Sequence, residues 1–219
     1  MSEKVVITID GPAASGKSST SQMVAERLGF LHVDSGSLYR AATAAALRVV
    51  PNPEEWTEEV VLGAARAVSL LPSRSSFYPV MGGRSVEEEI RGDRVTQNVS
   101  AVAKMPKVRD WVNECVRQTA ADHNVVVDGR DIGTVVFPRA RLKIFLIADA
   151  EVRAKRRLLQ KGGEITSGRL TEETSAIAER DRRDSEQTAP APDAIVIDST
   201  ALTQAEQVAR IVALAGDRG

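Results

Sequence analysis

The chain has one cysteine, few aromatic residues and almost no net charge. Cys115 is the only cysteine among 219 residues, so no disulfide can form within the chain. The net charge of −1 gives no overall attraction to nucleic acid or membrane, and aromatic residues make up only 4% of the chain, with no extended basic stripe beside them. A nucleic-acid partner is therefore not expected, and small anions must be held by local clusters of arginine and lysine.

A membrane span and a signal peptide are also lacking. No run of about 18 apolar residues is present. Residues 1–4 lead directly into an apolar run, without the basic region, apolar stretch and cleavage site of a signal peptide. We expect a cytoplasmic protein with no membrane partner. With 42% hydrophobic residues in 219, the chain can bury the core of one α/β domain that carries insertions.

Short apolar runs alternate with longer segments of helical spacing. Residues 4–10 are apolar and β-branched, and residues 17–28 have helical spacing that Gly29 can end. Further short apolar runs, most of them ending in aspartate, cover residues 31–34, 125–128, 143–148 and 194–198. This alternation predicts an α/β fold of three layers, α/β/α, in which helices cover both faces of a central parallel sheet.

The strongest local motif is G-x-x-x-x-G-K-S at residues 11–18, between the first predicted strand and the first predicted helix. Its glycines permit a tight turn, and the helix adds the positive end of its dipole, so phosphate oxygens find donors there. Lys17 would reach the β- and γ-phosphates, and the Ser18 hydroxyl could ligate Mg²⁺. We predict an ATP phosphate site, with Mg²⁺ as cofactor, formed by Gly11, Ala14, Ser15, Gly16, Lys17, Ser18 and Ser19. The alternative is a glycine-rich turn without a ligand.

Two further polar clusters follow predicted strands. Asp34 begins D-S-G-S-L-Y-R, and Asp128 begins D-G-R-D. Ligands of open α/β sheets sit at the carboxyl ends of the strands. Both clusters are therefore expected near the phosphate-binding loop of residues 11–18, called the P-loop below. The candidate Mg²⁺ ligands are Ser18, Asp34 and Asp128, the last of them through a water molecule. Arg130 could bind a phosphate. The alternatives are a helix cap formed by Ser35 or Ser37, with Asp34 as a turn residue, and a surface turn with an arginine–aspartate pair.

Five motifs in this order resemble those of bacterial cytidylate kinases. They are the P-loop, D-S-G-x-x-Y-R, S-x-V-A-x-x-P-x-V-R at residues 100–109, D-G-R-D-I-G-T-V-V-F-P at 128–138 and E-R-D-x-x-D-S at 179–185. The similarity covers nearly the whole chain, and the D-G-R-D segment is far more specific than the P-loop. The resemblance implies a P-loop NTPase that transfers the γ-phosphoryl group of ATP to CMP or dCMP.

The resemblance also implies which residues bind CMP. Ser100, Arg109 and Asp131 would face cytosine, where a carboxylate can accept from the N4 amino group and an arginine can donate to N3 and O2. Uracil has an oxygen at C4 and would leave the carboxylate repelled and unpaired. By the same resemblance, Ser35, Arg40 and Arg130 would hold the acceptor phosphate, and Arg180 and Asp184 would lie near its sugar.

The implied organisation is a single domain of residues 1–219. Its core would be residues 1–62 and 96–219, with a monophosphate-binding subdomain inserted at about residues 63–95 and a short lid at about residues 158–170. The sequence of residues 63–95 alone could equally be a surface excursion.

Charge compensation is the expected catalytic contribution. By resemblance, Lys17, Arg130, Arg153 and Arg157 would be the catalytic residues. The basic residues that resemble lid arginines closing over ATP are Arg153, Lys155, Arg156 and Arg157. The alternative for this basic helix is a solvated face. The acceptor is a phosphate oxygen, largely deprotonated at neutral pH because its second pKa is about 6. No general base is required, so His32 and His123 are expected to be structural.

One residue departs from the family pattern. Gln187 stands where an arginine is typical, so one positive charge that would bind the acceptor phosphate is missing. We hypothesise weaker binding of the acceptor or a substitute cation.

Two other functions stay open from sequence. One is a P-loop kinase for a different nucleoside monophosphate or a shikimate-like acceptor, which would not need the pair of Asp131 and Arg109. The other is a non-enzymatic module that binds ATP without an acceptor. We expect a monomer whose small-molecule partners are ATP and CMP or dCMP.

Overall fold

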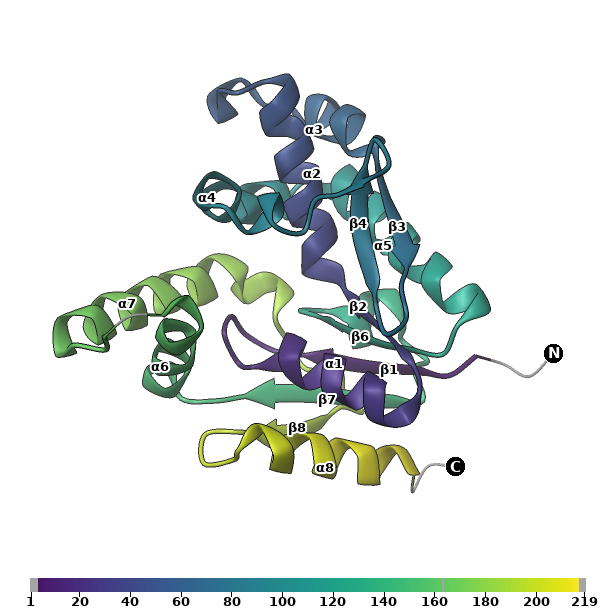
Figure 1. The fold of residues 1–219 in the computed structure, drawn as a ribbon, viewed down its shortest axis with the longest axis vertical. Helices are drawn as coiled ribbons and strands as arrows, with labels where there is room; N and C mark the ends of the chain where they lie inside the picture. Colours follow the sequence, from purple (N-terminus) through teal and green to yellow (C-terminus); the bar gives the residue numbers. More distant parts are fainter. Residues whose placement is uncertain (1–3, 163, 217–219) are drawn as a thin grey trace.

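Five parallel strands form the central sheet of the computed structural model, which describes residues 4–162 and 164–216 (Figure 1). In the order β2-β6-β1-β7-β8, they are β2 (Leu31–Asp34), β6 (Val125–Gly129), β1 (Val6–Asp10), β7 (Leu142–Ile147) and β8 (Ile195–Asp198). Every neighbouring pair is parallel. Each strand coincides with a predicted apolar run to within two residues, and the predicted parallel sheet is confirmed.

Side chains of the sheet pack into two apolar cores, one on each face. In β6, Val125 and Val127 join one core and Val126 joins the other, because successive side chains of a strand point to opposite faces. Helices cover both cores: α2 (Ser35–Val49) and α5 (Pro106–Asp122) on the first, α1 (Lys17–Leu28) and α8 (Gln204–Gly216) on the second. The fold is therefore the predicted three-layer arrangement.

The first helix matches its prediction at both ends. α1 begins at Lys17, directly after the P-loop, and ends at Leu28. Gly29 follows with φ 68°, a left-handed conformation that favours glycine, and its N–H bonds back to the carbonyls of the last turn. This helix places the P-loop at the carboxyl edge of the sheet.

A second sheet accompanies the segment that was predicted as an insertion. It is antiparallel and consists of β3 (Val68–Pro72), β4 (Phe77–Met81) and β5 (Arg84–Ser85). The neighbouring helices and turns are η1 (Pro53–Glu55), α3 (Glu58–Ala65), η2 (Glu89–Arg91) and α4 (Asp93–Val102). With α2, these elements form the upper part of the molecule in Figure 1. The predicted limits of the insertion, residues 63–95, fall inside α3 and α4.

A helical hairpin extends from the carboxyl end of β7. It consists of α6 (Ala150–Lys161) and α7 (Ser167–Asp184), which pack against each other. The predicted lid, residues 158–170, spans the end of α6 and the start of α7, and Gly163 within it lies outside the described residues. The two remaining elements are short helical turns, η3 (Ile132–Val136) after β6 and η4 (Ser185–Gln187) after α7. No helix in the described part of the chain is long and apolar enough to cross a membrane.

Replacing Ile144 in β7 by alanine should lower the free energy of unfolding by about 2–5 kcal/mol, because Ile144 is fully buried in the second core and its truncation leaves a cavity. Urea denaturation followed by circular dichroism measures the change. Val196→Ala is the control: Val196 is 49% exposed on β8, and its truncation should change stability by less than about 1 kcal/mol. Equal losses in the two variants would contradict this description of the core.

Candidate functional site

A cleft of about 1210 Å³ opens where β1, β2 and β6 end. Its walls come from the P-loop, the start of α2, the turn after β6, and helices α4 to α7. Most of the residues predicted from sequence line it: Ala14, Gly16, Lys17, Ser18, Ser19, Asp34, Ser35, Arg40, Ser100, Arg109, Asp128, Arg130, Asp131, Arg157, Arg180 and Asp184. Segments far apart in the sequence are thus brought to one cleft.

Three predicted residues lie outside the lining of this cleft: Gly11, Ser15 and Arg153. Gly11 has φ 154°, and a Cβ atom there would lie 2.2 Å from the backbone oxygen of Leu146, so glycine is required for close packing of the loop on β7. Ser15 is fully buried. Arg153 is also buried, and its guanidinium donates to the backbone oxygen of Ala13 at 2.9 Å.

The P-loop takes a strained turn that is suited to anions. Ala14 has φ 56°, and no other non-glycine residue in the described ranges has a positive φ. Lys17 Nζ donates to the backbone oxygen of Pro12 at 3.1 Å. Desolvation, and then the charge of Arg130, lower the pKa of Lys17 to about 7. Phosphate oxygens beside Lys17 would raise that pKa again and keep the ammonium charged.

Two carboxylates face the P-loop from the ends of β2 and β6, where Asp34 and Asp128 are paired in register. Asp128 Oδ2 accepts a hydrogen bond from Ser18 Oγ at 2.6 Å. Asp34 Oδ1 accepts from the N–H of Ser37 at 3.2 Å, so Asp34 is the N-cap of α2. The alternative that Ser35 or Ser37 caps this helix is therefore wrong. Burial, and then the charge of Asp128, raise the pKa of Asp34.

His32 belongs to the site, although the sequence analysis assigned it a structural role alone. Its Nε2 lies 2.6 Å from Asp128 Oδ1, and its side chain is buried. Burial would lower the pKa of His32 and raise that of Asp128, but their hydrogen bond and charges outweigh it, so the pKa of His32 is raised and that of Asp128 lowered. His32 therefore fixes the carboxylate that Ser18 contacts.

An ion pair between Arg109 and Asp131 lies in the same cleft. The guanidinium of Arg109, on α5, donates to Asp131 Oδ2 and also to the backbone oxygen of Ala103 at 3.2 Å. The two side chains stay 19% and 15% exposed, so both can still contact a ligand. Ser100, on α4, is 8% exposed and lines the cleft as well. The three residues expected to face a base are thus in one cleft.

Several arginines converge around Asp184, between the P-loop and α7. Arg130 donates to Asp184 Oδ2 at 3.2 Å and to the backbone oxygen of Gly11 at 3.0 Å. Arg180 Nε lies 3.6 Å from the same Asp184 oxygen. Burial, and then the charge of Arg130, lower the pKa of Arg180 to about 10. A phosphate group among these guanidiniums would relieve their mutual repulsion.

Arg40 and Arg157 join this cluster from α2 and α6. Arg40 donates to the backbone oxygen of Ile90 at 3.2 Å and to Thr96 Oγ1 at 3.0 Å, which ties it to the inserted segment. Arg157 pairs with Glu173 on α7 at 2.9 Å. Both guanidiniums therefore have protein partners and face the cleft at the same time.

Asp10 is a second buried carboxylate that the sequence analysis did not name. It ends β1, next to the P-loop, and is only 5% exposed. Its Oδ1 accepts from the N–H of Ile132 at 2.9 Å and its Oδ2 from the N–H of Gly133 at 2.8 Å. These bonds hold the turn that carries Asp131. Burial is the main reason that the pKa of Asp10 is raised to about 6, against the lowering effect of the two amides.

Several cleft residues were not predicted to belong to the site. Tyr39, which is part of the D-S-G-x-x-Y-R motif, and Arg91 line the cleft, and Thr203 and Gln207 line it around the start of α8. Gln187, which departs from the family pattern, also lines it and donates to the backbone oxygen of Ala103 at 3.5 Å. Arg91, Thr203 and Gln207 belong to no motif, so only the fold brings them to the site.

The donor set fits a magnesium ion that is shared with a ligand. Within the described ranges, no group of three or more histidine, cysteine and acidic side chains could hold a metal alone. Ser18, Asp34 and Asp128 bring one hydroxyl and two carboxylates to the cleft. Mg²⁺ typically takes one or two carboxylates and completes its shell with water and phosphate oxygens, so these residues suffice when a phosphorylated ligand is present.

Comparison with known proteins agrees with the motifs. Residues 7–217 match the family described as cytidylate kinase. A cytidylate kinase of Geobacillus thermodenitrificans is 42% identical over 225 residues, covering 100% of this chain and 99% of that protein. A cytidylate kinase of Pasteurella multocida is 37% identical over 214 residues, covering 96% and 94%.

Similarity to solved structures concerns the fold alone. A shikimate kinase of Bacteroides thetaiotaomicron superposes with a TM-score of 0.50 at 14% identity, covering 97% of this chain and 98% of its own. An uncharacterised protein from Eubacterium ventriosum gives a TM-score of 0.51 at 11% identity, covering 97% and 99%. Both are consistent with the three-layer α/β fold.

The amide proton of Gly133 should titrate with a midpoint near pH 6, because its acceptor Asp10 has a pKa of about 6. Two-dimensional NMR over pH 4–8 measures the chemical shift, and Asp10→Asn should abolish the titration. Since the folded pKa lies above the ordinary value of about 4, the stabilising contribution of protonated Asp10 is lost as the pH rises from about 4 to about 6. A midpoint near pH 4 would contradict this account of Asp10.

Proposed function

The chain belongs to the cytidylate kinase family, and we propose that its cleft holds ATP at the P-loop and CMP or dCMP at the pair of Arg109 and Asp131. The reaction transfers the γ-phosphoryl group of ATP to the monophosphate and gives ADP and CDP or dCDP. One observation supports the proposal most: a single cleft contains the anion-binding loop, a cluster of arginines, and a carboxylate paired with an arginine.

The alternatives from sequence fit this cleft less well. A shikimate-like acceptor has no amino group for Asp131 to accept from, and a module that binds only ATP would not need a cluster of arginines in addition to the P-loop. Membership of the family does not favour either alternative.

On the donor side, the phosphates of ATP would lie on residues 11–19 with Lys17 as their point charge. Burial, and then the charge of Arg130, lower the pKa of Lys17 to about 7, and Lys17 gains a full charge when phosphate oxygens approach it. The base and sugar of ATP would then extend toward Thr203 and Gln207, which line the cleft beyond the loop.

On the acceptor side, Asp131 would accept the N4 amino hydrogens of cytosine, and Arg109 and Ser100 would contact the remaining base edge. The monophosphate would lie among Arg40, Arg130 and Arg180, with Ser35 and Asp184 completing the acceptor site. This arrangement gives the surplus positive charge around Asp184 an anion to bind.

The inserted segment would serve as the monophosphate-binding subdomain, because Arg40 is bonded to Ile90 and Thr96 at its end. The hairpin of α6 and α7 would carry the lid, with Arg157 directed to the cleft. The monomeric state and the cytoplasmic location stay predictions.

The chemistry requires alignment and charge compensation. An oxygen of the acceptor phosphate, largely deprotonated because its second pKa is about 6, attacks the γ-phosphorus, while the bond to the β,γ-bridging oxygen breaks and ADP leaves. Lys17, Arg130 and Arg157 would compensate the charge on the transferring group. Covering by the lid would exclude water and so limit hydrolysis of ATP.

Magnesium would be held by Ser18 directly and by Asp34 and Asp128, with His32 fixing the orientation of Asp128. When bound, the ion neutralises charge on the β- and γ-phosphates of ATP. The start of α1 would therefore supply the hydroxyl, and the ends of β2 and β6 the two carboxylates, of the magnesium site.

Replacing Asp131 by asparagine should lower kcat/KM for CMP by at least about 100-fold, because the acceptor of the cytosine amino group loses its charge and half of its accepting capacity. The ratio of UMP to CMP activity should rise, since an asparagine NH₂ can donate to the uracil oxygen. A coupled assay of ADP release with CMP, dCMP, UMP, AMP and shikimate measures both. Asp110→Asn, an exposed carboxylate on α5, is the control. Unchanged activity with CMP would overturn the acceptor assignment.

Replacing Asp128 by asparagine should raise the Mg²⁺ concentration needed for half-maximal ADP release by at least about 10-fold, because one carboxylate is lost while the hydrogen bond to Ser18 can persist. Removal of Mg²⁺ with EDTA should abolish activity in both proteins. Asp122→Asn, exposed at the end of α5, is the control. An unchanged Mg²⁺ requirement would remove Asp128 from the metal site.

A further inference from the structure

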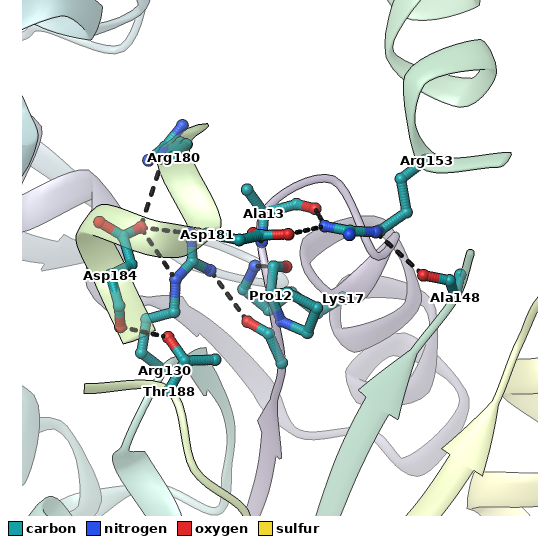
Figure 2. Close-up of polar contacts among 11 residues, drawn as sticks. Pro12, Ala13, Lys17, Arg130, Ala148, Arg153, Arg180, Asp181, Asp184 and Thr188 are labelled. Carbon is teal, nitrogen blue, oxygen red and sulfur yellow. Dashed lines mark hydrogen bonds and ion pairs between the residues drawn. The ribbon is translucent and has the colours of Figure 1, made fainter. Parts of the chain in front are cut away.

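Both backbone groups of Ala13, in the middle of the P-loop, are held by one pair of side chains (Figure 2). Arg153 Nη1 donates to the Ala13 oxygen at 2.9 Å and to Asp181 Oδ2 at 2.7 Å. The other oxygen of Asp181 accepts from the Ala13 N–H at 3.3 Å. Arg153 Nε donates to the backbone oxygen of Ala148 at 3.0 Å, which anchors the guanidinium to the end of β7.

The surroundings of Arg153 differ from those of the other arginines on α6. Arg153 is 7% exposed and lies outside the lining of the cleft, whereas Arg156 and Arg157 line it. Its guanidinium is already shared between one carboxylate and two backbone oxygens. In Figure 2 its guanidinium lies on the opposite side of Ala13 from Arg130. Arg153 therefore has protein partners that compensate its charge without a nucleotide.

Hydrogen bonds to the backbone of Ala13 restrict the conformation of the neighbouring residue Ala14. Ala14 has φ 56°, a conformation that a non-glycine residue adopts at a cost of about 1–3 kcal/mol unless its surroundings impose it. Fixing the N–H and the oxygen of Ala13 fixes both peptide planes that lead into Ala14. The orientation of the following N–H groups, on which phosphate binding depends, is fixed in turn.

Helix α7, which carries Asp181, also holds the start of the loop. Asp184 lies three residues after Asp181 on α7, so both face the same side of the helix. Asp184 accepts from Arg130, whose Nη1 donates to the backbone oxygen of Gly11 at 3.0 Å. Through these two aspartates, α7 holds the loop at Gly11 and at Ala13, both on the amino-terminal side of the strained Ala14.

We propose that Asp181 and Arg153 are positioning residues that hold Ala13 so that the P-loop is shaped for the nucleotide phosphates before the nucleotide binds. Neither side chain touches the nucleotide. The inference rests on the proposed function of the P-loop as the ATP site, and it gives Arg153 a different role from that of the catalytic lid arginine expected from sequence.

A double-mutant cycle tests the pair. Asp181→Asn, Arg153→Gln and the double variant should each raise KM for ATP, and the Kd of ADP measured by calorimetry without CMP, by about 10-fold. The double variant should be no worse than either single variant, because both act through Ala13. KM for CMP should change less than about 2-fold, since the loop is on the donor side. Glu179→Gln, exposed on α7 and paired with Arg182 and Arg183, is the matched control.

Two outcomes would overturn the proposal. Additive losses, with Arg153→Gln much the larger, would mean that Arg153 contacts the nucleotide directly. An equal rise of KM for ATP and CMP would mean general loosening of the fold. Should Arg153→Gln fail to fold by circular dichroism, Arg153→Lys replaces it in the cycle, and its single ammonium should restore part of the ADP affinity. Calorimetry with ADP also separates this proposal from the proposed function, because absence of CMP-stimulated ADP release from the unmodified protein would affect only the latter.

Discussion

Parallel pairing of β2, β6 and β1 brings three aspartates to one edge of the sheet, and the site is built around the need to compensate them. Asp34 and Asp128 are paired in register, and Asp10 is paired with the residue after Asp128. Carboxylates at such an edge are costly to bury unless each has its own donors or cations. Asp10 accepts two backbone amides, Asp128 accepts from Ser18 and contacts His32, and Asp34 caps α2.

These different partners distinguish the carboxylate that holds a turn from the two that line the cleft. Asp10 is turned toward the chain after Asp131 and uses both oxygens there, so it shapes the site without facing the cleft. Asp34 and Asp128 line the cleft beside Lys17, and their charges oppose the lowering of the Lys17 pKa by burial and by Arg130. The edge therefore presents both signs of charge: carboxylates suited to a cation, and basic side chains suited to phosphate.

The sequence predicted the parts of the molecule that depend on local pattern. The alternation of apolar runs predicted the parallel sheet, and the spacing of residues 17–28 with Gly29 predicted α1 to the residue. His32, Asp10 and Asp181 were missed because their roles depend on which segments meet in space. His32 looks like any residue of an apolar strand until β2 pairs with β6 and brings it within 2.6 Å of Asp128. The motif that contains Asp181 predicted roles for Arg180 and Asp184 only. The partner of Asp181 is Arg153, which lies 28 residues earlier on α6.

Helix α7 links the two ends of the cleft more directly than the motifs suggested. Asp181 reaches the P-loop, and Arg180 and Asp184 lie in the arginine cluster, so one rigid helix serves both groups of contacts. Its N-terminal half contacts α6 through Glu173, which forms ion pairs with Arg157 and Lys161. A displacement of the hairpin that improved contacts at one end of the cleft would change the contacts of α7 at the other. A ligand that favours one position of the hairpin must therefore also change the affinity of the second ligand, by the reciprocity of binding free energies.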